Sequence, residues 1–304
     1  MDSLKENLQS EQGKVKKKPN KFLNLLISIG CMVAFFMTLN MVIVVCMIPI
    51  TAKAYLDAHS DIALVSQLIQ EYSMKYSLYC QFVGEVVLTV LSILLYNLIF
   101  VRKNKKNGTY ESGIKKSTAW ITIATILVGE PVIFCMAVIL ETVAVKLMPG
   151  VAEMMNEMLS LAAGAEDNTI LGKIIGYLSI GVLAPIAEEV TFRGIIVENS
   201  KRAYKIVGCV IITAVLFGIM HMNPIQALYV LPMGAISGFI AYKYKTVIPS
   251  ICIHIINNSI GLYIGYLFDP FEYWWVMAII SVVAIPCLLL IFKKNPYITQ
   301  SKTK

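Results

Sequence analysis

Two adjacent glutamates and an arginine stand at the end of an apolar stretch, in the order Glu188-Glu189-x-x-x-Arg193. An ionisable side chain in hydrocarbon costs several kcal/mol, so such residues are candidates for function. On a helix, Glu189 and Arg193 lie four residues apart in the order that favours an ion pair. Glu188 points about 100° away and stays free. We therefore expect Glu188 to act as a general base, with two carboxylates facing cytoplasmic water at a helix end as the simpler alternative.

Two of the three histidines interrupt apolar stretches further along the chain. His221 follows Phe217 by four residues and Asn258 follows His254 by four, so each pair shares one helix face. An isolated histidine inside a membrane most often packs or bonds between helices. Together with the glutamate pair, however, these residues favour one common site. His59 falls in an expected external loop and is given no role.

This set of residues fits the hydrolysis of a peptide bond, which needs a base for water, a donor for the oxyanion and exclusion of solvent. Glu188 could activate water that His221 orients. His254 and the amide of Asn258 could then donate to the oxyanion. Alternatively, Glu188, His221 and His254 could form a two-histidine, one-carboxylate zinc site with water as the fourth ligand. The residues alone leave both chemistries open.

The elements that must position these residues are membrane helices. The chain is 57% hydrophobic and 15% charged, with a mean hydropathy of +0.71, whereas a soluble domain is about half apolar and a quarter charged. A net charge of +7 would suggest nucleic acid in a soluble protein, but here the basic residues cluster between apolar runs and fit membrane topology. No nucleic-acid partner is expected. The seven cysteines lie mostly in apolar runs, which indicates small hydrophobic side chains.

Apolar runs of suitable length predict an all-α, polytopic transmembrane bundle of about eight spans. The expected spans are 22–50, 78–101, 119–145, 172–192, 206–222, 226–242, 247–267 and 273–292. Basic residues collect in alternate loops, so the positive-inside rule places both termini in the cytoplasm. The organisation is a basic arm at 1–21, a single transmembrane domain at 22–292 and a cytoplasmic tail at 293–304. The external segments 51–77 and 146–171 are expected to form interfacial amphipathic helices.

The ordered motifs Glu188-Glu189-x-x-x-Arg193, Phe217-x-x-x-His221 and His254-x-x-x-Asn258 resemble those of the CPBP family. These are CAAX-processing and bacteriocin-processing membrane proteases that include the Ras-converting endopeptidase. The resemblance covers a catalytic core at about 172–262. It implies Glu188 as base, His221 for water positioning, and His254 and Asn258 for the oxyanion, with Glu189, Arg193 and Phe217 in support. It also implies a metal-free glutamate protease without a cofactor, with zinc as the alternative.

The interpretation is an intramembrane endopeptidase acting on a hydrophobic or membrane-anchored peptide in the lipid bilayer, as a multi-pass protein of a bacterial cell membrane. Its cavity is expected to open towards the cytoplasm or the inner leaflet. The main alternative is an inactive relative that serves as a bacteriocin-immunity or scaffold protein. A transporter is disfavoured because the polar groups cluster instead of forming a series across the membrane.

Three further expectations concern packing. Glu85 and Glu130 could line the same cavity, although a carboxyl bonded to a neighbouring helix is the more common arrangement. Gly234-x-x-x-Gly238 and Gly261-x-x-x-Gly265 predict close helix contacts. Straight helices would separate the two histidines by about 12 Å in depth at 1.5 Å per residue. We therefore expect the fifth span to enter the membrane late after Lys205, or to break early at Asn223-Pro224.

Overall fold

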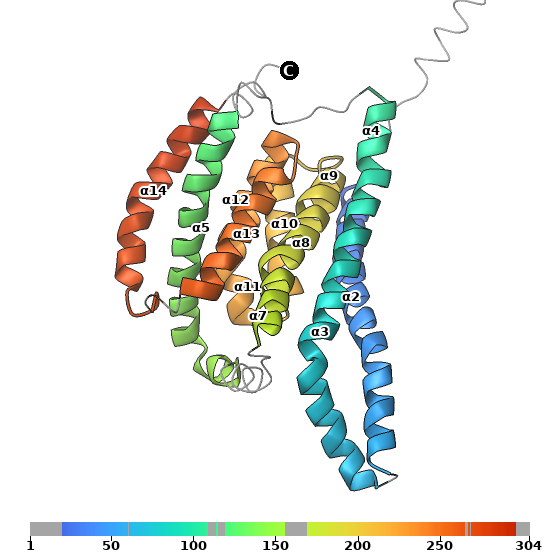
Figure 1. The fold of residues 1–304 in the computed structure, drawn as a ribbon. Coiled ribbons are helices and arrows are strands. Elements are labelled where there is room, and N and C mark those ends of the chain that lie inside the picture. Colours follow the sequence, from blue (N-terminus) through green and yellow to red (C-terminus); the bar gives the residue numbers. More distant parts are fainter. Residues whose placement is uncertain are drawn as a thin grey trace, which may run out of the picture.

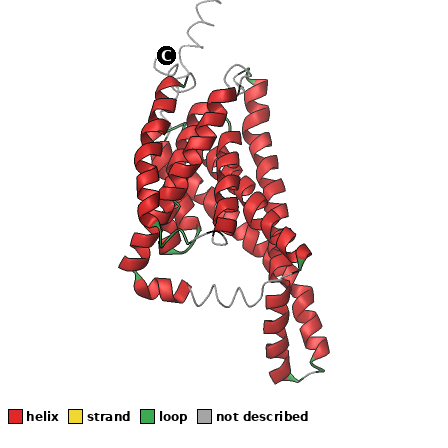
Figure 2. Ribbon diagram, turned by 60° about the vertical axis from the view of Figure 1, so that its left-hand side comes forward, coloured by secondary structure: helices red, strands yellow, loops and turns green. Residues whose placement is uncertain are grey.

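The protein is a bundle of helices, seen in a computed structural model that describes residues 20–59, 61–108, 114, 119–155, 169–264, 267 and 269–295. Most helices of this part of the chain run side by side (Figure 1). A view turned by 60° shows helices and connecting loops (Figure 2). The predicted all-helical fold is confirmed. Nearly all of the expected basic arm and most of the expected tail lie outside the described residues.

Within the described residues, five helical segments are long and apolar enough to cross a membrane. They are Lys21–Asp57, Ile62–Lys106, Ala119–Leu147, Ile170–Ser200 and Trp274–Lys294. Each of the eight apolar runs does contain a helix, but three of the helices have fewer than the roughly 20 residues that a span needs. These are α10 (Ile206–Met220), α12 (Leu231–Tyr244) and α13 (Ile248–Tyr263). The count of eight spans therefore stays a prediction.

The first two long helices form a hairpin that differs from expectation. α2 (Lys21–Asp57) and α3 (Ile62–Tyr96) extend through most of the segment 51–77 as continuations of the long helices, so the interfacial helices predicted there are wrong. Asp57 fixes the tip of the hairpin, because it accepts hydrogen bonds from Lys53 Nζ at 2.8 Å and Tyr72 Oη at 2.6 Å. The hairpin projects beyond the other helices (Figure 1).

The second expected interfacial segment, 146–171, is described only in part. Its first residues complete α5 (Ala119–Leu147), and residues 149–155 are also helical. Residues 156–168 lie outside the described part of the chain. The expectation for this segment is therefore neither confirmed nor contradicted.

The segment that carries the glutamates is one continuous helix that alternates between α and π geometry. Its parts are α7 (Ile170–Gly176), η3 (Tyr177–Leu183), α8 (Ala184–Glu189), η4 (Val190–Ile196) and α9 (Val197–Ser200). Neighbouring helices bond to its backbone: Thr89 donates to the Leu183 carbonyl at 3.1 Å and Thr213 to the Phe192 carbonyl at 3.2 Å. π turns are rare and occur frequently at functional sites.

An early break ends α10 at Met220, as one of the two depth hypotheses predicted. Met222 has a left-handed φ of 55°, and the Asn223 side chain then accepts from two backbone amides to start α11 (Pro224–Tyr229). Val230 separates α11 from α12. The single span expected at 226–242 is therefore two helices, of which the first is only 6 residues long.

Two glycines on α12, Gly234 and Gly238, allow α10 to pack closely against it. A Cβ at Gly234 would lie 2.7 Å from Ala214 Cα, and one at Gly238 would lie 2.6 Å from Thr213 Cγ2. The first glycine pair thus packs as predicted. A Cβ at Gly261 on α13 would meet no atom within 4 Å, so its predicted helix contact is wrong, and Gly265 lies outside the described residues.

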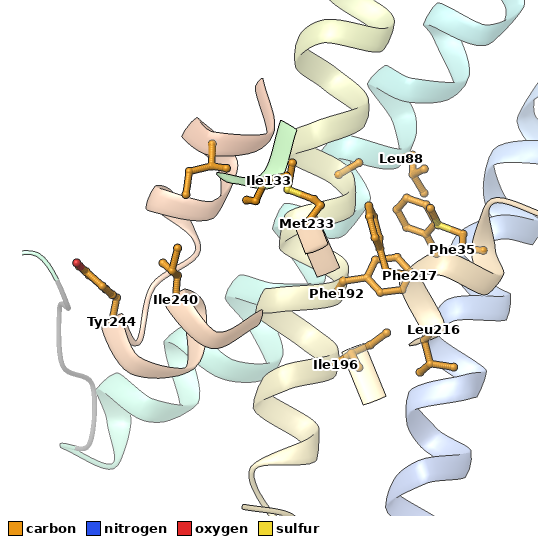
Figure 3. Packing of buried hydrophobic residues seen from close by; sticks show 13 residues of the cluster. Phe35, Leu88, Ile133, Phe192, Ile196, Leu216, Phe217, Met233, Ile240 and Tyr244 are labelled. Atoms are coloured by element: carbon orange, nitrogen blue, oxygen red, sulfur yellow. The ribbon is translucent and has the colours of Figure 1, made fainter. Parts of the chain in front are cut away.

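Aromatic rings form the centre of the main hydrophobic cluster. Figure 3 shows Phe192 and Phe217 together there, with Phe35 beside them. The Phe192 ring meets the Phe217 ring edge-on at 5.3 Å between centroids and the Phe35 ring at 6.0 Å. This cluster joins α2, η4 and α10, so it fixes the segment with the glutamates against the helix that ends in His221.

Candidate active site

The predicted ion pair between Glu189 and Arg193 is present and fully buried. Arg193 Nη1 lies 3.1 Å from Glu189 Oε1, and both side chains have 0% exposure. The guanidinium carbon also lies 4.3 Å from the centroid of the Phe217 ring, within the range of a cation–π contact. Glu189 is thus engaged by a buried counter-ion, whereas Glu188 has no ion pair with Arg193 among the described residues.

His254 lies between the two glutamates. Its Nδ1 is 2.9 Å from Glu189 Oε1, and its Nε2 is 3.7 Å from Glu188 Oε2. An ionised carboxylate only accepts, so the shared hydrogen belongs to Nδ1 and the Nε2 of a neutral ring is an acceptor. The bond to Glu189 was missed from the sequence, because nothing in the spacing of His254 reveals which glutamate α13 faces.

Phe217 resolves the expected mismatch in depth between the histidines. Its ring meets the His221 ring at 4.9 Å and the His254 ring at 5.8 Å, both edge-on. Phe217 lies one turn before His221 on α10 and is therefore closer in depth to His254. Its ring can contact both imidazoles although the two histidines lie at different depths. The aromatic side chain thereby links two imidazoles that come from different helices.

His221 is the C-cap residue directly after α10, where the backbone still needs hydrogen-bond partners. Its Nδ1 lies 2.8 Å from the Phe217 carbonyl oxygen, and its backbone amide bonds to Gly218. A ring nitrogen facing a carbonyl carries the hydrogen. The other nitrogen, Nε2, is therefore the one that can act on a ligand as an acceptor.

The Asn258 amide bonds to a carbonyl that a proline has left without a backbone donor. In η3 the hydrogen bonds run five residues back, as from the Ala184 amide to the Ser179 carbonyl. The next donor in this register would be Pro185, which has no N–H. Asn258 Nδ2 instead donates to the Ile180 carbonyl at 2.9 Å. One amide hydrogen of Asn258 is therefore committed to the helix that carries Glu188.

One cavity of about 740 Å³ brings the four predicted catalytic residues together. Its lining includes Glu188, His221, His254 and Asn258, and also Phe217. Glu189 and Arg193, which were predicted as supporting residues, are fully buried behind it.

The cavity also has polar lining residues that sequence reasoning missed or left open. They are Gln81, Glu85, Glu141, Gln226, Tyr229 and Asn257. Glu85 was recognised as a polar interruption of an apolar run, but its direction could not be derived. Glu141, Gln226 and Tyr229 lie within two turns of a helix end, where polar residues are common and carry no signal by themselves, and the directions of Gln81 and Asn257 could not be derived.

The cavity lies towards the end of the bundle opposite to the expected one. The basic end carries Lys21, Arg102, Lys201, Lys205, Lys243 and Lys293, and the other end carries Asp57, Asp61, Glu153 and Asp269. Lining residues include Glu141, Tyr229 and Phe271, which lie at the acidic end, where α7 and α11 are found in Figure 1.

The sequence predicts an opening towards the cytoplasm or the inner leaflet, which the positive-inside rule assigns to the basic end. The difference has a physical reason. The early end of α10 and the short α11 leave space on the acidic side, whereas the buried side chains of Phe192, Arg193 and Ile196 fill the basic side.

The alternative zinc site needs Glu188, His221 and His254 to converge on one point. In the part of the chain that the structure describes, no three His, Cys, Asp or Glu side chains are placed to hold a metal ion. Both histidines use Nδ1 for protein contacts, so only Nε2 of each is left for a metal. The residues as arranged do not form the tetrahedral ligand set of a catalytic zinc.

Residues 170–260 match a family model described as Type II CAAX prenyl endopeptidase Rce1-like. The matched segment is less than a third of the chain and contains every predicted site residue. No curated protein and no solved structure was found to match the chain. The match confirms the resemblance that the three motifs indicated, and it supports a protease that is integral to a membrane.

Proposed function

Because residues 170–260 resemble the Rce1-like CAAX prenyl endopeptidases, we propose that this chain is an intramembrane endopeptidase that uses a glutamate-activated water. The observation that carries the proposal is the shared cavity, whose walls hold Glu188, His221, His254 and Asn258. The substrate is a hydrophobic or membrane-anchored peptide, because the cavity lies within a bundle whose outer helices suit a lipid bilayer.

Glu188 is the base in this proposal. Its carboxylate faces the cavity with 16% exposure and is not held by Arg193. The 3.7 Å between Glu188 Oε2 and His254 Nε2 is too long for a direct hydrogen bond, and a water between two polar groups is a common arrangement at such distances. A water held there is in reach of the base, and His221, which also lines the cavity, is the residue proposed to orient it through Nε2.

His254 takes up a proton during the reaction. With Nδ1 fixed on Glu189, the ring donates to an oxyanion through Nε2 only as the imidazolium. The proton that Glu188 removes from water can pass to this nitrogen across the short gap. Glu189 then stabilises the imidazolium and keeps its orientation, in the way that a carboxylate holds the histidine of a catalytic triad.

Asn258 supplies the second oxyanion donor. One amide hydrogen bonds to the Ile180 carbonyl, and the other remains for the substrate. Since the donor is fixed before the substrate arrives, it needs no reorganisation in the transition state, which is the condition for a large electrostatic contribution.

The test is cleavage of a panel of internally quenched hydrophobic peptides by the full chain, purified in detergent. Wild type should cleave at least one peptide, and Glu188→Gln should abolish turnover while the protein stays folded by thermal melting. Equal rates for wild type and Glu188→Gln would exclude the mechanism. Absence of cleavage for the whole panel by folded wild type would favour the inactive relative, an immunity or scaffold protein.

A further inference from the structure

The cavity walls carry carboxylates without a matching strong cation. The described lining includes Glu85, Glu141 and Glu188, and it includes no lysine or arginine. Arg193 pairs with Glu189, but its side chain is fully buried and does not reach the cavity. A ligand entering this cavity therefore meets carboxyl groups that no lysine or arginine of the described walls pairs with.

Glu85 is the carboxylate that most clearly lacks a partner. It lies on α3 with 5% exposure, and its Oε2 has no hydrogen-bond partner in the described part of the chain. It is close enough to Glu188 for the two carboxylates to interact electrostatically. A buried polar atom without a partner is costly, so native proteins seldom keep one unless something else satisfies it.

Glu141 places a second carboxyl group on the cavity wall, towards the acidic end of the bundle. It lies on α5, close enough to the Tyr229 hydroxyl for an electrostatic interaction. Glu85 is near the base and Glu141 is near the acidic end of the bundle, so carboxyl groups line the cavity from that end to Glu188. A charged donor that bonds to a carboxylate makes a shorter and stronger hydrogen bond than a neutral one.

We propose that the cavity recognises a cationic group of the peptide substrate, a lysine or arginine side chain or a free amino terminus, which binds to Glu85 and Glu141 close to the scissile bond. This inference rests on the proposed endopeptidase function and specifies its substrate class.

The experiment uses pairs of internally quenched hydrophobic peptides that differ at one position, with lysine in one member and norleucine in the other. Since the cleavage site is unknown, the position is scanned along the peptide. At the best position, the lysine peptide should have a kcat/KM roughly 10 to 100 times higher, the value of one hydrogen bond to a charged group. Glu85→Gln and Glu141→Gln should each lower this ratio, mainly through the KM of the lysine peptide.

A matched control is Glu130→Gln. Glu130 is also a buried carboxyl of the membrane helices, on α5, but it does not line the cavity. This variant should keep the preference for lysine. Loss of preference in Glu130→Gln to the same degree as in Glu85→Gln would overturn the assignment, because the effect would then be one of fold or net charge.

Binding separates the failure of this inference from the failure of the proposed function. Fluorescence anisotropy of the labelled peptides with Glu188→Gln protein needs no turnover. Tighter binding of the lysine peptide, reduced by adding Glu85→Gln, supports the cationic site even if no peptide is cleaved. Equal affinity for lysine and norleucine peptides at every position overturns it, even if wild type cleaves both.

Discussion

Replacing Glu189 by glutamine is expected to destabilise the protein strongly, whereas the same change at Glu188 is expected to stop the reaction with little loss of stability. The Glu189 and Arg193 side chains are both at 0% exposure, with 3.1 Å between their charged atoms. Removing one partner of a buried ion pair costs about 3 to 5 kcal/mol, because the other charge is left in the interior. In Glu189→Gln the Arg193 guanidinium keeps its contacts with the Phe217 ring and the Met233 carbonyl oxygen. Neither group carries a negative charge that would replace the lost carboxylate.

The two variants should separate clearly in a thermal melt. At roughly 2 to 4 °C per kcal/mol for a large domain, the cost for Glu189→Gln corresponds to a fall in Tm of roughly 6 to 20 °C. Glu188 faces the cavity, and the His254 ring nitrogen nearest to its carboxylate is 3.7 Å away, beyond hydrogen-bond distance. We expect Glu188→Gln to change the Tm by less than about 2 °C, because this change breaks no buried ion pair.

The assay compares full-length variants in one detergent, with Tm from intrinsic tryptophan fluorescence and cleavage rates measured below the lower Tm. Glu130→Gln is the control for neutralising a buried carboxyl that has no ion pair in the described residues. Its Tm should fall less than that of Glu189→Gln. Equal Tm values for Glu188→Gln and Glu189→Gln, or full activity in Glu188→Gln, would refute the division of roles between the two glutamates.

Three other predictions concern Asn258, the metal question and helix packing. Asn258→Ala should slow cleavage by about 10² to 10³, the usual effect of losing one oxyanion donor, and a rate within threefold of wild type would remove Asn258 from the site. Active protein should contain no stoichiometric zinc by elemental analysis, and its cleavage rate should not change when a chelator is added. Loss of activity with chelator and its recovery with added zinc would establish the metal alternative. Gly238→Ala should destabilise by about 1 to 3 kcal/mol because its methyl would lie 2.6 Å from a side chain of α10. Gly261→Ala, with open space around it, should melt like wild type, and equal Tm values for these two variants would contradict the packing.

Local geometry explains which parts of the site could be derived from the sequence. The pairing of Glu189 with Arg193 follows from the four-residue spacing on any helix, and the structure has it. The break after His221 followed from Asn223 and Pro224, which cap and start α11. The gathering of the motif residues on one cavity also followed, because polar groups inside apolar segments need a common polar environment.

Contacts between helices could not be derived in the same way. The bond from His254 to Glu189 depends on how α13 is rotated against α8, and a few tens of degrees would direct the imidazole to Glu188 instead. The direction of Glu85 depends on the rotation of α3 in the same manner. The position of the cavity towards one end of the bundle depends on where α10 and α11 end, and helix boundaries are the part of a fold that sequence predicts least well.

The π turns explain why the positions of the base and of one oxyanion donor are linked. Glu188 lies on the helix that contains these turns, and Asn258 bonds to the backbone of the same helix. Pro185 withholds the amide that the Ile180 carbonyl would receive in the π register, and Asn258 replaces it. Ile180 precedes Glu188 by eight residues, about 12 Å along the same helix at 1.5 Å per residue. The helix that presents Glu188 therefore also fixes the amide of Asn258. Both His254 and Asn258 lie on α13, and each bonds to the helix that carries Glu188. A shift of α13 against this helix would break both bonds, so the two oxyanion donors would lose their positions relative to the base together.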